Sequence, residues 1–259
     1  MSIVRKIGRS FRRDGLWRTL ILCTRNIHPA KRDVAPSDFD IRFGLHTEGR
    51  VELGDLKIDS PSYLRGNAYA PTPPSVFDRM MMLLPAPEKY SFVDLGSGKG
   101  RVVLMAALRP FKAVVGVEFS SELSAVAETN LVKFRPHVRS SDVRLVCNDA
   151  VLFNFPPGPL IVWFYHSFAK EVLARVFERL IQRQHETIFI YYNAHYHELF
   201  SECDVLYSDK DICIWKIAGT QSHLSSSNGT EVGDKVPAIT RLAGGGAATE
   251  KHETRKEIL

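Results

Sequence analysis

Apolar runs alternate with amphipathic segments from residue 91 onward, and this alternation constrains the fold more than any other feature of the sequence. The apolar runs predict strands over residues 91–96, 113–119, 142–149, 159–166 and 186–193. The helical periodicity between them predicts helices over residues 99–108, 121–134 and 169–182. Continuous apolar strands separated by helices pair in parallel, with helices on both faces of the sheet.

The flanking segments set the limits of the predicted domain. Residues 204–217 contain two strands around a polar turn, which predicts a hairpin and antiparallel pairing at one edge of the sheet. Upstream, residues 34–65 look irregular, with a strand or hairpin within residues 50–58, and a helix begins near Pro74. We expect the domain to occupy residues 34–218 and the polar residues 219–259 to form a disordered tail.

The net charge of +5 is concentrated at the N-terminus. Residues 1–33 hold nine Lys and Arg against Asp14 and Asp33, so the remaining chain carries a net charge of −2. The overall basicity therefore gives no specific nucleic-acid signal. Apolar and basic residues fall on opposite faces of residues 1–33, which predicts an amphipathic helix. Such a helix either packs on the domain or lies on an anionic membrane surface.

Cysteine usage and hydropathy indicate an intracellular setting. The four cysteines form no CxxC pair, so we expect neither a disulfide framework nor a metal site. No apolar stretch reaches the ~18 residues of a membrane span, and no secretory signal is recognisable. The expected location is cytoplasmic, with peripheral membrane contact through residues 1–33 as the alternative.

Three glycines, Gly96, Gly98 and Gly100, directly follow the first strand of the alternating region. A nucleoside-triphosphate loop requires Ser or Thr where Gly100 stands, and glycine where Val93 stands. The dinucleotide fingerprint GxGxxG differs in spacing, and the carboxylate of Asp94 would repel a pyrophosphate. A carboxylate at this position instead favours a ligand with positive charge and no phosphate.

The stretch D-L-G-S-G-K-G resembles the first motif of the class I S-adenosylmethionine-dependent methyltransferases. The resemblance continues in "VVGVEFS" and "LVCNDA", which end the next two strands, and covers about residues 71–217. It implies a Rossmann-like, doubly wound, mostly parallel seven-stranded sheet with an antiparallel last strand. It also implies S-adenosylmethionine as the cofactor, with Glu118 on the ribose hydroxyls and Asp149 and Ala150 at the adenine. The implied loop residues are Asp94, Gly96, Ser97, Gly98 and Gly100.

A narrower resemblance links "FVDLGSGKGRVVL" to lysine methyltransferases that lack the SET domain. Upstream, "YAPTPPSV" looks like the Tyr-Pro-Ser/Thr segment that closes over the methionine end of the cofactor in those relatives. Tyr69 and Thr72 are the matching positions, and a simple turn before a helix is the alternative reading.

The substrate-facing motif departs from the amino-directed relatives, which often carry Asn-Pro or Asp-Pro after the fourth strand. This sequence has Tyr165 and His166 there. We expect His166 to accept a proton from the acceptor or hydrogen-bond to it, with aromatic residues as walls, and a strand-end histidine bonded to backbone is the alternative reading. We therefore expect a methyltransferase that acts on a protein lysine or another amine. The alternatives are a small-molecule or lipid-associated acceptor, or a non-catalytic cofactor-binding module. Methyl transfer requires no metal, and none is predicted.

Overall fold

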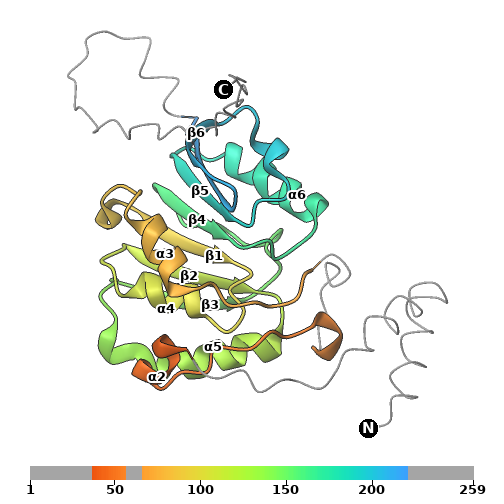
Figure 1. Ribbon diagram of the computed structural model, residues 1–259. Helices are drawn as coiled ribbons and strands as arrows, with labels where there is room; N and C mark the ends of the chain where they lie inside the picture. The colour runs from red at the N-terminus through yellow and green to blue at the C-terminus, as the bar shows by residue number, and fades with distance from the viewer. Residues whose placement is uncertain (1–36, 57–65, 221–259) are drawn as a thin grey trace, which may run out of the picture.

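The computed structural model describes residues 37–56 and 66–220 (Figure 1). The predicted basic segment, residues 1–33, lies outside these ranges. Nearly all of the predicted tail, residues 219–259, lies outside them as well. Both stay predictions, as does the domain boundary at residue 34.

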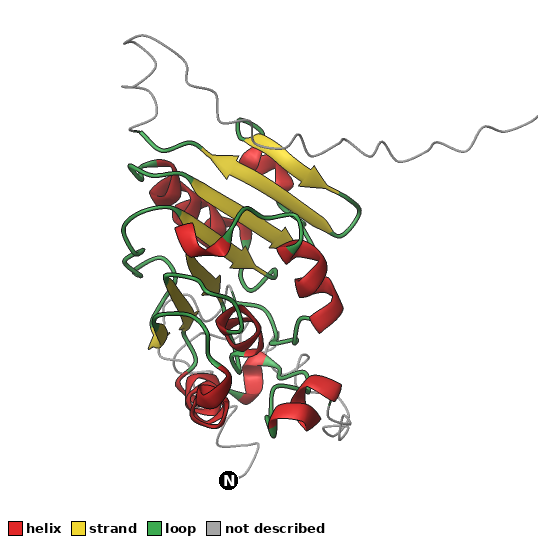
Figure 2. Ribbon diagram, turned by 90° about the vertical axis from the view of Figure 1, so that its left-hand side faces the viewer, coloured by secondary structure: helices red, strands yellow, loops and turns green. Residues whose placement is uncertain are grey.

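Seven strands form one twisted sheet in the order β3-β2-β1-β4-β5-β7-β6 (Figure 2). Six of them run in the same direction, and β7 is antiparallel to both of its neighbours, β5 and β6. This topology confirms the predicted doubly wound sheet with an antiparallel last strand. The strands are β1 (Ser91–Leu95), β2 (Ala113–Glu118), β3 (Val143–Cys147), β4 (Leu160–Phe164), β5 (Thr187–Tyr192), β6 (Asp204–Ser208) and β7 (Ile212–Ile217).

Helices cover both faces of the sheet, because the strands are apolar on both sides. One hydrophobic core joins a face of the sheet to α3 (Pro74–Met81), α4 (Arg101–Ala107) and α5 (Ser121–Phe134). A second core joins the other face to α6 (Lys170–Ile181) and to the short 3-10 helix η5 (His197–Phe200). The other 3-10 helices within the described residues are η1 (Leu53–Asp55), η3 (Pro87–Lys89) and η4 (Arg135–His137).

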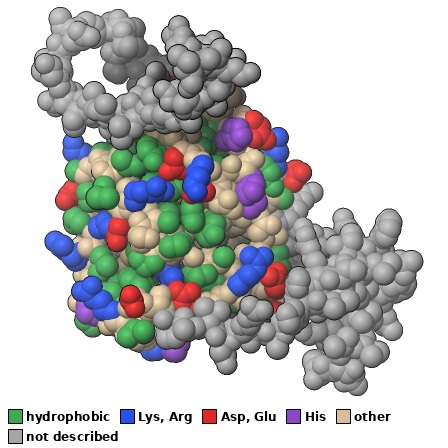
Figure 3. Space-filling view, in the orientation of Figure 1, with side chains coloured by type: hydrophobic (Ala, Val, Ile, Leu, Met, Phe, Trp, Pro, Cys, Tyr) green, Lys and Arg blue, Asp and Glu red, His purple; other side chains and the backbone are tan. Residues whose placement is uncertain are grey.

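The surface carries charges of both signs. Figure 3 shows Lys and Arg interspersed with Asp and Glu over the face seen in Figure 1, with apolar side chains between them. Within the described ranges, none of the helices has the length and apolarity that crossing a membrane requires.

The strand order places the carboxyl ends of β1 and β4 next to each other in the middle of the sheet. The chain leaves β1 toward β2 on one side and later returns to β4 on the other side. In open α/β sheets, ligands bind at such a reversal of strand order, beyond the carboxyl ends of the strands. The fold therefore brings the polar residues that follow β1, β2 and β4 to one edge.

A short helix, α2 (Asp38–Phe43), lies in the segment that the sequence suggested to be irregular. The Ser37 hydroxyl caps its start by accepting the N–H of Asp40 at 3.3 Å, and Gly44 ends it with φ 65°. The Phe43 ring packs edge-on against Phe134 of α5 at 4.8 Å between centroids. A six-residue helix is too short to produce a visible hydrophobic period, so this contact with α5 is what stabilises it.

The strand or hairpin predicted within residues 50–58 is only partly described. Val51 forms an isolated antiparallel bridge with Tyr69, and the following residues form η1 rather than a strand. Residues 57 and 58 lie outside the described ranges.

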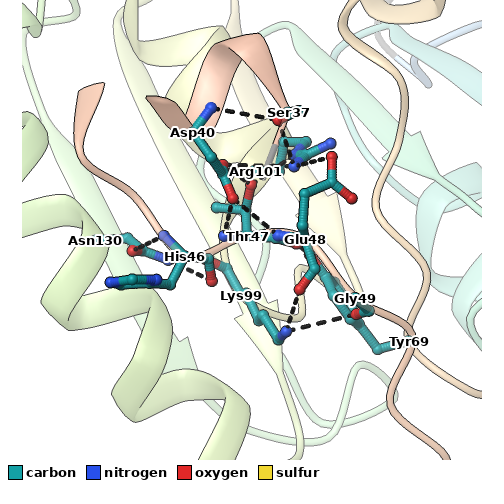
Figure 4. Close-up of polar contacts among 10 residues, drawn as sticks. All are labelled: Ser37, Asp40, His46, Thr47, Glu48, Gly49, Tyr69, Lys99, Arg101 and Asn130. Atoms are coloured by element: carbon teal, nitrogen blue, oxygen red, sulfur yellow. Dashed lines mark hydrogen bonds and ion pairs between the residues drawn. The ribbon is translucent and has the colours of Figure 1, made fainter. Parts of the chain in front are cut away.

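A buried ion network ties residues 37–49 to the start of α4 (Figure 4). The Arg101 guanidinium lies 2.6 Å from a carboxylate oxygen of Glu48 and 3.4 Å from one of Asp40. Its Nε donates to the Thr47 hydroxyl at 2.6 Å. The Asp40 carboxylate also accepts the backbone N–H groups of Thr47 and Glu48, at 2.7 and 3.0 Å. These bonds compensate for the desolvation of the buried charges.

We expect Arg101→Ala to lower the free energy of unfolding by about 3–5 kcal/mol, because the substitution leaves the Asp40 carboxylate buried without its cation. Urea denaturation of the full chain measures this change. The control is Arg144→Ala, since Arg144 pairs with Asp142 at 2.8 Å with both side chains about half exposed. We expect the control to change stability by less than about 1 kcal/mol. Equal effects of the two substitutions would contradict a structural role for the buried network.

Candidate functional site

A cavity of about 280 Å³ lies at the carboxyl ends of β1, β2 and β4. Its lining includes every predicted site residue except Gly98 and Gly100. These lining residues are Tyr69, Thr72, Asp94, Gly96, Ser97, Glu118, Asp149, Ala150, Tyr165 and His166. Residues separated by up to about 100 positions in the sequence therefore meet in one cavity.

Two glycines of the loop after β1, Gly96 and Gly98, are required by close contacts and by left-handed backbone conformations. Gly98 has φ 54°, and a Cβ built there would lie 2.1 Å from the Tyr69 ring. Gly96 has φ 78°, and its Cβ would lie 2.3 Å from the Ser167 side chain. The glycine loop is thus covered on one side by Tyr69 and on the other by the residues that follow β4.

Tyr69 is fixed over the glycine loop by a hydrogen bond to Thr47 and by a cation beside its ring. Its hydroxyl donates to the carbonyl oxygen of Thr47 at 2.7 Å. The Lys99 ammonium lies 5.3 Å from the centre of the Tyr69 ring and donates to the carbonyl oxygen of Glu48 at 2.5 Å. Burial raises the pKa of Tyr69 well above its usual value, so the phenol remains protonated.

Two acids, Asp94 and Glu118, are both buried in the cavity wall. Glu118 accepts the backbone N–H of Gly98 and that of Ser120, each at 2.8 Å. Burial raises the pKa of Glu118 to about 7, against the lowering effect of these hydrogen bonds. Burial and the neighbouring Glu118 charge raise the pKa of Asp94 well above its usual value. A cation or a set of hydroxyl donors entering the cavity would favour the ionised form of both groups.

Two buried polar atoms in the cavity wall have no hydrogen-bond partner: the Ser97 hydroxyl oxygen and the Trp163 indole nitrogen. The Ser97 hydroxyl lies against Gly116 of β2, where an added Cβ would be 2.9 Å from its oxygen, so the fit of a cationic ligand depends on the two buried acids. S-adenosylmethionine has the matching groups, since it combines a cationic sulfonium and ammonium with a carboxylate and ribose hydroxyls. From the sequence, Trp163 could be either a core residue or part of an aromatic wall. In the structure it belongs to one hydrophobic core and also lines the cavity.

Asp149 lies in a turn that uses one of its carboxylate oxygens. Asp149 Oδ1 accepts the Val151 N–H at 2.9 Å, and Asn148 Oδ1 accepts the N–H of Asp149 at 2.8 Å. Ala150 is buried beside this turn. Asn148 also lines the cavity, although the sequence analysis did not single it out. Its place next to Asp149, at the end of a predicted strand, was the available signal.

The residues after β4 form the opposite end of the cavity. His166 has φ 41°, an unusual conformation for a residue other than glycine, and Asn193 after β5 has φ 57°. The Asn67 side chain donates to the carbonyl oxygen of His166 at 2.7 Å, and the Asn67 N–H donates to Ser167 O at 2.9 Å. The Tyr165 ring packs on Tyr192 with centroids 4.4 Å apart. The strained turn is therefore held from both sides, and sequence reasoning missed the contribution of Asn67.

The glycine loop, the two buried acids and the reversal of strand order together define a class of protein: the class I S-adenosylmethionine-dependent methyltransferases. Residues 64–146 match the family described as "Histone methylation protein DOT1". This match contains the glycine loop, Glu118 and the segment around Tyr69. It supports an enzyme that uses S-adenosylmethionine as its methyl donor.

Comparison with solved structures finds distant likenesses. One is an RNA methyltransferase from Salinibacter ruber in complex with S-adenosyl-L-homocysteine, at 21% identity and a TM-score of 0.42, covering 57% of this chain and 94% of that chain. Another is a putative RNA methyltransferase from Pyrococcus horikoshii, at 20% identity and a TM-score of 0.46, covering 64% of this chain and 95% of that chain. A search of the curated proteins finds no match.

We expect Gly98→Ala to destabilise the protein more than Gly158→Ala. Both glycines have positive φ, but an added Cβ at Gly158 meets no atom within 4 Å, whereas at Gly98 it meets the Tyr69 ring. The control, Gly158→Ala, should therefore lower the free energy of unfolding only by the backbone strain, about 1–2 kcal/mol. Chemical denaturation measures the stability of both variants. In a Tyr69→Ala background, most of the additional destabilisation of Gly98→Ala over Gly158→Ala should disappear. Additional destabilisation that persists without the ring would show that Tyr69 is not its cause.

The raised pKa of Glu118 predicts a pH-dependent stability. Between the ordinary value of 4.5 and the folded-state value of about 7, the folded protein binds more protons than the unfolded chain. The free energy of unfolding should therefore fall as pH rises through this window, by on the order of 3 kcal/mol from Glu118 alone. Glu118→Gln should flatten the decline, whereas Glu128→Gln, at an exposed position on α5, should leave it unchanged. Denaturation curves from pH 4.5 to 8 test this, and an equally steep decline in Glu118→Gln would contradict the assignment.

Proposed function

We propose that the chain transfers the methyl group to an amine, with the lysine side chain of a protein as the leading acceptor. The observation that carries this proposal is the composition of one cavity. Aromatic side chains, Trp163 and Tyr165, line it together with the two acids, Asp94 and Glu118. Aromatic faces and carboxylates both attract cationic groups, so the cavity suits an amine as well as the sulfonium.

For the cofactor, we propose the following positions. Glu118 accepts the ribose hydroxyls, because a carboxylate suits two donors. Asp149 and Ala150 hold the adenine, and Asp94 faces the cationic amino acid part. The glycine loop, with Gly96, Ser97, Gly98 and Gly100, allows the ligand to approach the backbone closely. Tyr69 and Thr72 cover the methionine end.

The bound sulfonium supplies an already activated methyl group. The residues of the chain therefore need to align the acceptor nitrogen with the methyl carbon and to exclude water. An amine attacks only through its neutral form, and an apolar aromatic wall lowers the pKa of a bound amine. Tyr165, packed against Tyr192, supplies such a wall, and His166 and Tyr165 are the residues that we place against the acceptor.

The match to the DOT1 family supports this choice of acceptor class, since that family is described by histone methylation. The match covers the part of the chain that forms the cofactor end. The acceptor end, after β4 and β5, lies outside the matched residues 64–146. The choice of a protein lysine therefore depends on the chemistry of the cavity walls.

Incubation of the full chain with radiolabelled S-adenosylmethionine and a cell extract tests the proposal. We expect label in the protein fraction, and hydrolysis should recover it as methyllysine. Glu118→Gln should reduce labelling about 10- to 100-fold at limiting cofactor, because it removes the charged acceptor of hydrogen bonds. Glu171→Gln, at an exposed position on α6, should label as the natural sequence does. Label in nucleic acid, in lipid or in small molecules would overturn the proposed acceptor.

A further inference from the structure

A buried tyrosine of β5 contacts the imidazole that faces the cavity. The Tyr191 hydroxyl lies 2.8 Å from Nδ1 of His166, and the Tyr191 side chain is fully buried. His166 lines the cavity, whereas Tyr191 stands behind it and does not. Sequence reasoning selected His166 and overlooked Tyr191, which lies 25 residues further along in the adjacent strand.

The hydrogen bonding of the Tyr191 hydroxyl determines which nitrogen of His166 carries the proton. Among the described residues, Nδ1 of His166 is the only hydrogen-bond partner of this hydroxyl, at 2.8 Å. A buried hydroxyl proton without an acceptor costs free energy, and a phenol donates more strongly than it accepts. The hydroxyl proton therefore goes to Nδ1 of His166, which must be an acceptor. A neutral imidazole with an unprotonated Nδ1 carries its proton on Nε2.

The surroundings of the ring keep His166 neutral. Burial, together with the charge of the nearby His195, lowers the pKa of His166 to about 4. The titratable groups packed around the ring are Tyr191 on β5 and His195 and Tyr196 on the loop that follows, with ring centroids of the last two at 4.2 and 5.2 Å. Burial also raises the pKa of Tyr191 above its usual value, so its phenol stays protonated and keeps donating. Glu198 acts on Tyr191 in the same direction and is itself paired with Lys170 at 2.7 Å.

The backbone limits the movement of the ring as well. His166 is held in its left-handed conformation by the Asn67 side chain, which donates to its carbonyl oxygen. Reversal of the ring about χ2 would place Cδ2 at the Tyr191 hydroxyl, and because carbon cannot accept its proton, the hydrogen bond to Nδ1 would be lost. The Nε2–H group is therefore kept away from Tyr191.

We propose that Tyr191 is a positioning residue that holds His166 as a neutral Nε2–H donor facing the methyl acceptor. His166 then orients the acceptor by donating to one of its oxygen atoms, such as the carbonyl oxygen of a peptide beside the amine. It does not take the proton of the amine. The amine loses that proton to solvent before the attack, in which the new N–C bond forms as the C–S bond breaks. The route of the proton rests on the proposed function, whereas the state of His166 does not.

Nitrogen NMR of the full chain, labelled with ¹⁵N in histidine, tests the state of His166 without any methyl transfer. The His166 signals are identified by their loss in His166→Gln. We expect the Nε2–H form, with a titration midpoint well below pH 6.5. Tyr191→Phe should mix the two neutral forms and raise the midpoint, because Nδ1 loses its donor. Tyr192→Phe, at the next position of β5, should change neither. An Nδ1–H form in the natural sequence, or unchanged signals in Tyr191→Phe, would overturn the proposal.

Two substitutions at His166 separate donation from proton removal. Glutamine keeps an N–H donor near the position of Nε2 but has no basic nitrogen, and alanine has neither. We expect His166→Ala to lower kcat/KM about tenfold, in keeping with the loss of one hydrogen bond. We expect His166→Gln to keep most of the activity of the natural sequence. Equal losses in both variants would indicate a base and overturn the donor role. If the natural sequence labels no amine in any fraction, the proposed function fails while the NMR result still decides the state of His166.

Discussion

Two buried carboxyl groups at neighbouring strand ends constrain the rest of the site. Asp94 and Glu118 are almost fully removed from water, and such groups are stable only as neutral acids or with donors around them. Glu118 obtains two donors from backbone, and one of these, the N–H of Gly98, belongs to the glycine loop. The glycine loop therefore donates a hydrogen bond to Glu118, so a change in the loop conformation would leave this buried carboxyl with one donor fewer.

Residues far from the glycine loop in the sequence hold its conformation. Residues 46–49 lie across α4 and α5 and are fixed there by the Arg101 network and by Asn130, whose side chain accepts the His46 N–H at 2.9 Å and donates to Lys99 O at 3.0 Å. Tyr69 hydrogen-bonds to this segment and covers Gly98. The Arg101 network and Asn130 thus hold residues 46–49, residues 46–49 hold Tyr69, and Tyr69 covers the glycine loop.

The sequence predicted the sheet, its helices and the strand ends because each of these follows from local hydrophobic patterns. Carboxyl ends of parallel strands meet at one edge, so the sequence alone predicts that Asp94, Glu118 and Asp149 lie close together. The buried network around Arg101 could not be predicted, because ion pairs between residues 37–49 and α4 leave no periodic trace. The protonation state of His166 could not be predicted either, because it depends on one hydroxyl group in the adjacent strand.

The position of β7 has a consequence for the order in which the molecule is completed. During synthesis, the glycine loop, Glu118 and Asp149 have emerged by about residue 150, and the strands that carry them pair only with one another and with β4. By contrast, β5 keeps an open edge until Ile212–Ile217 arrives to pair with it, from Thr187 to Tyr192. Unpaired edges recruit other chains, so the nascent protein is most vulnerable to misassembly on the side that carries Tyr191.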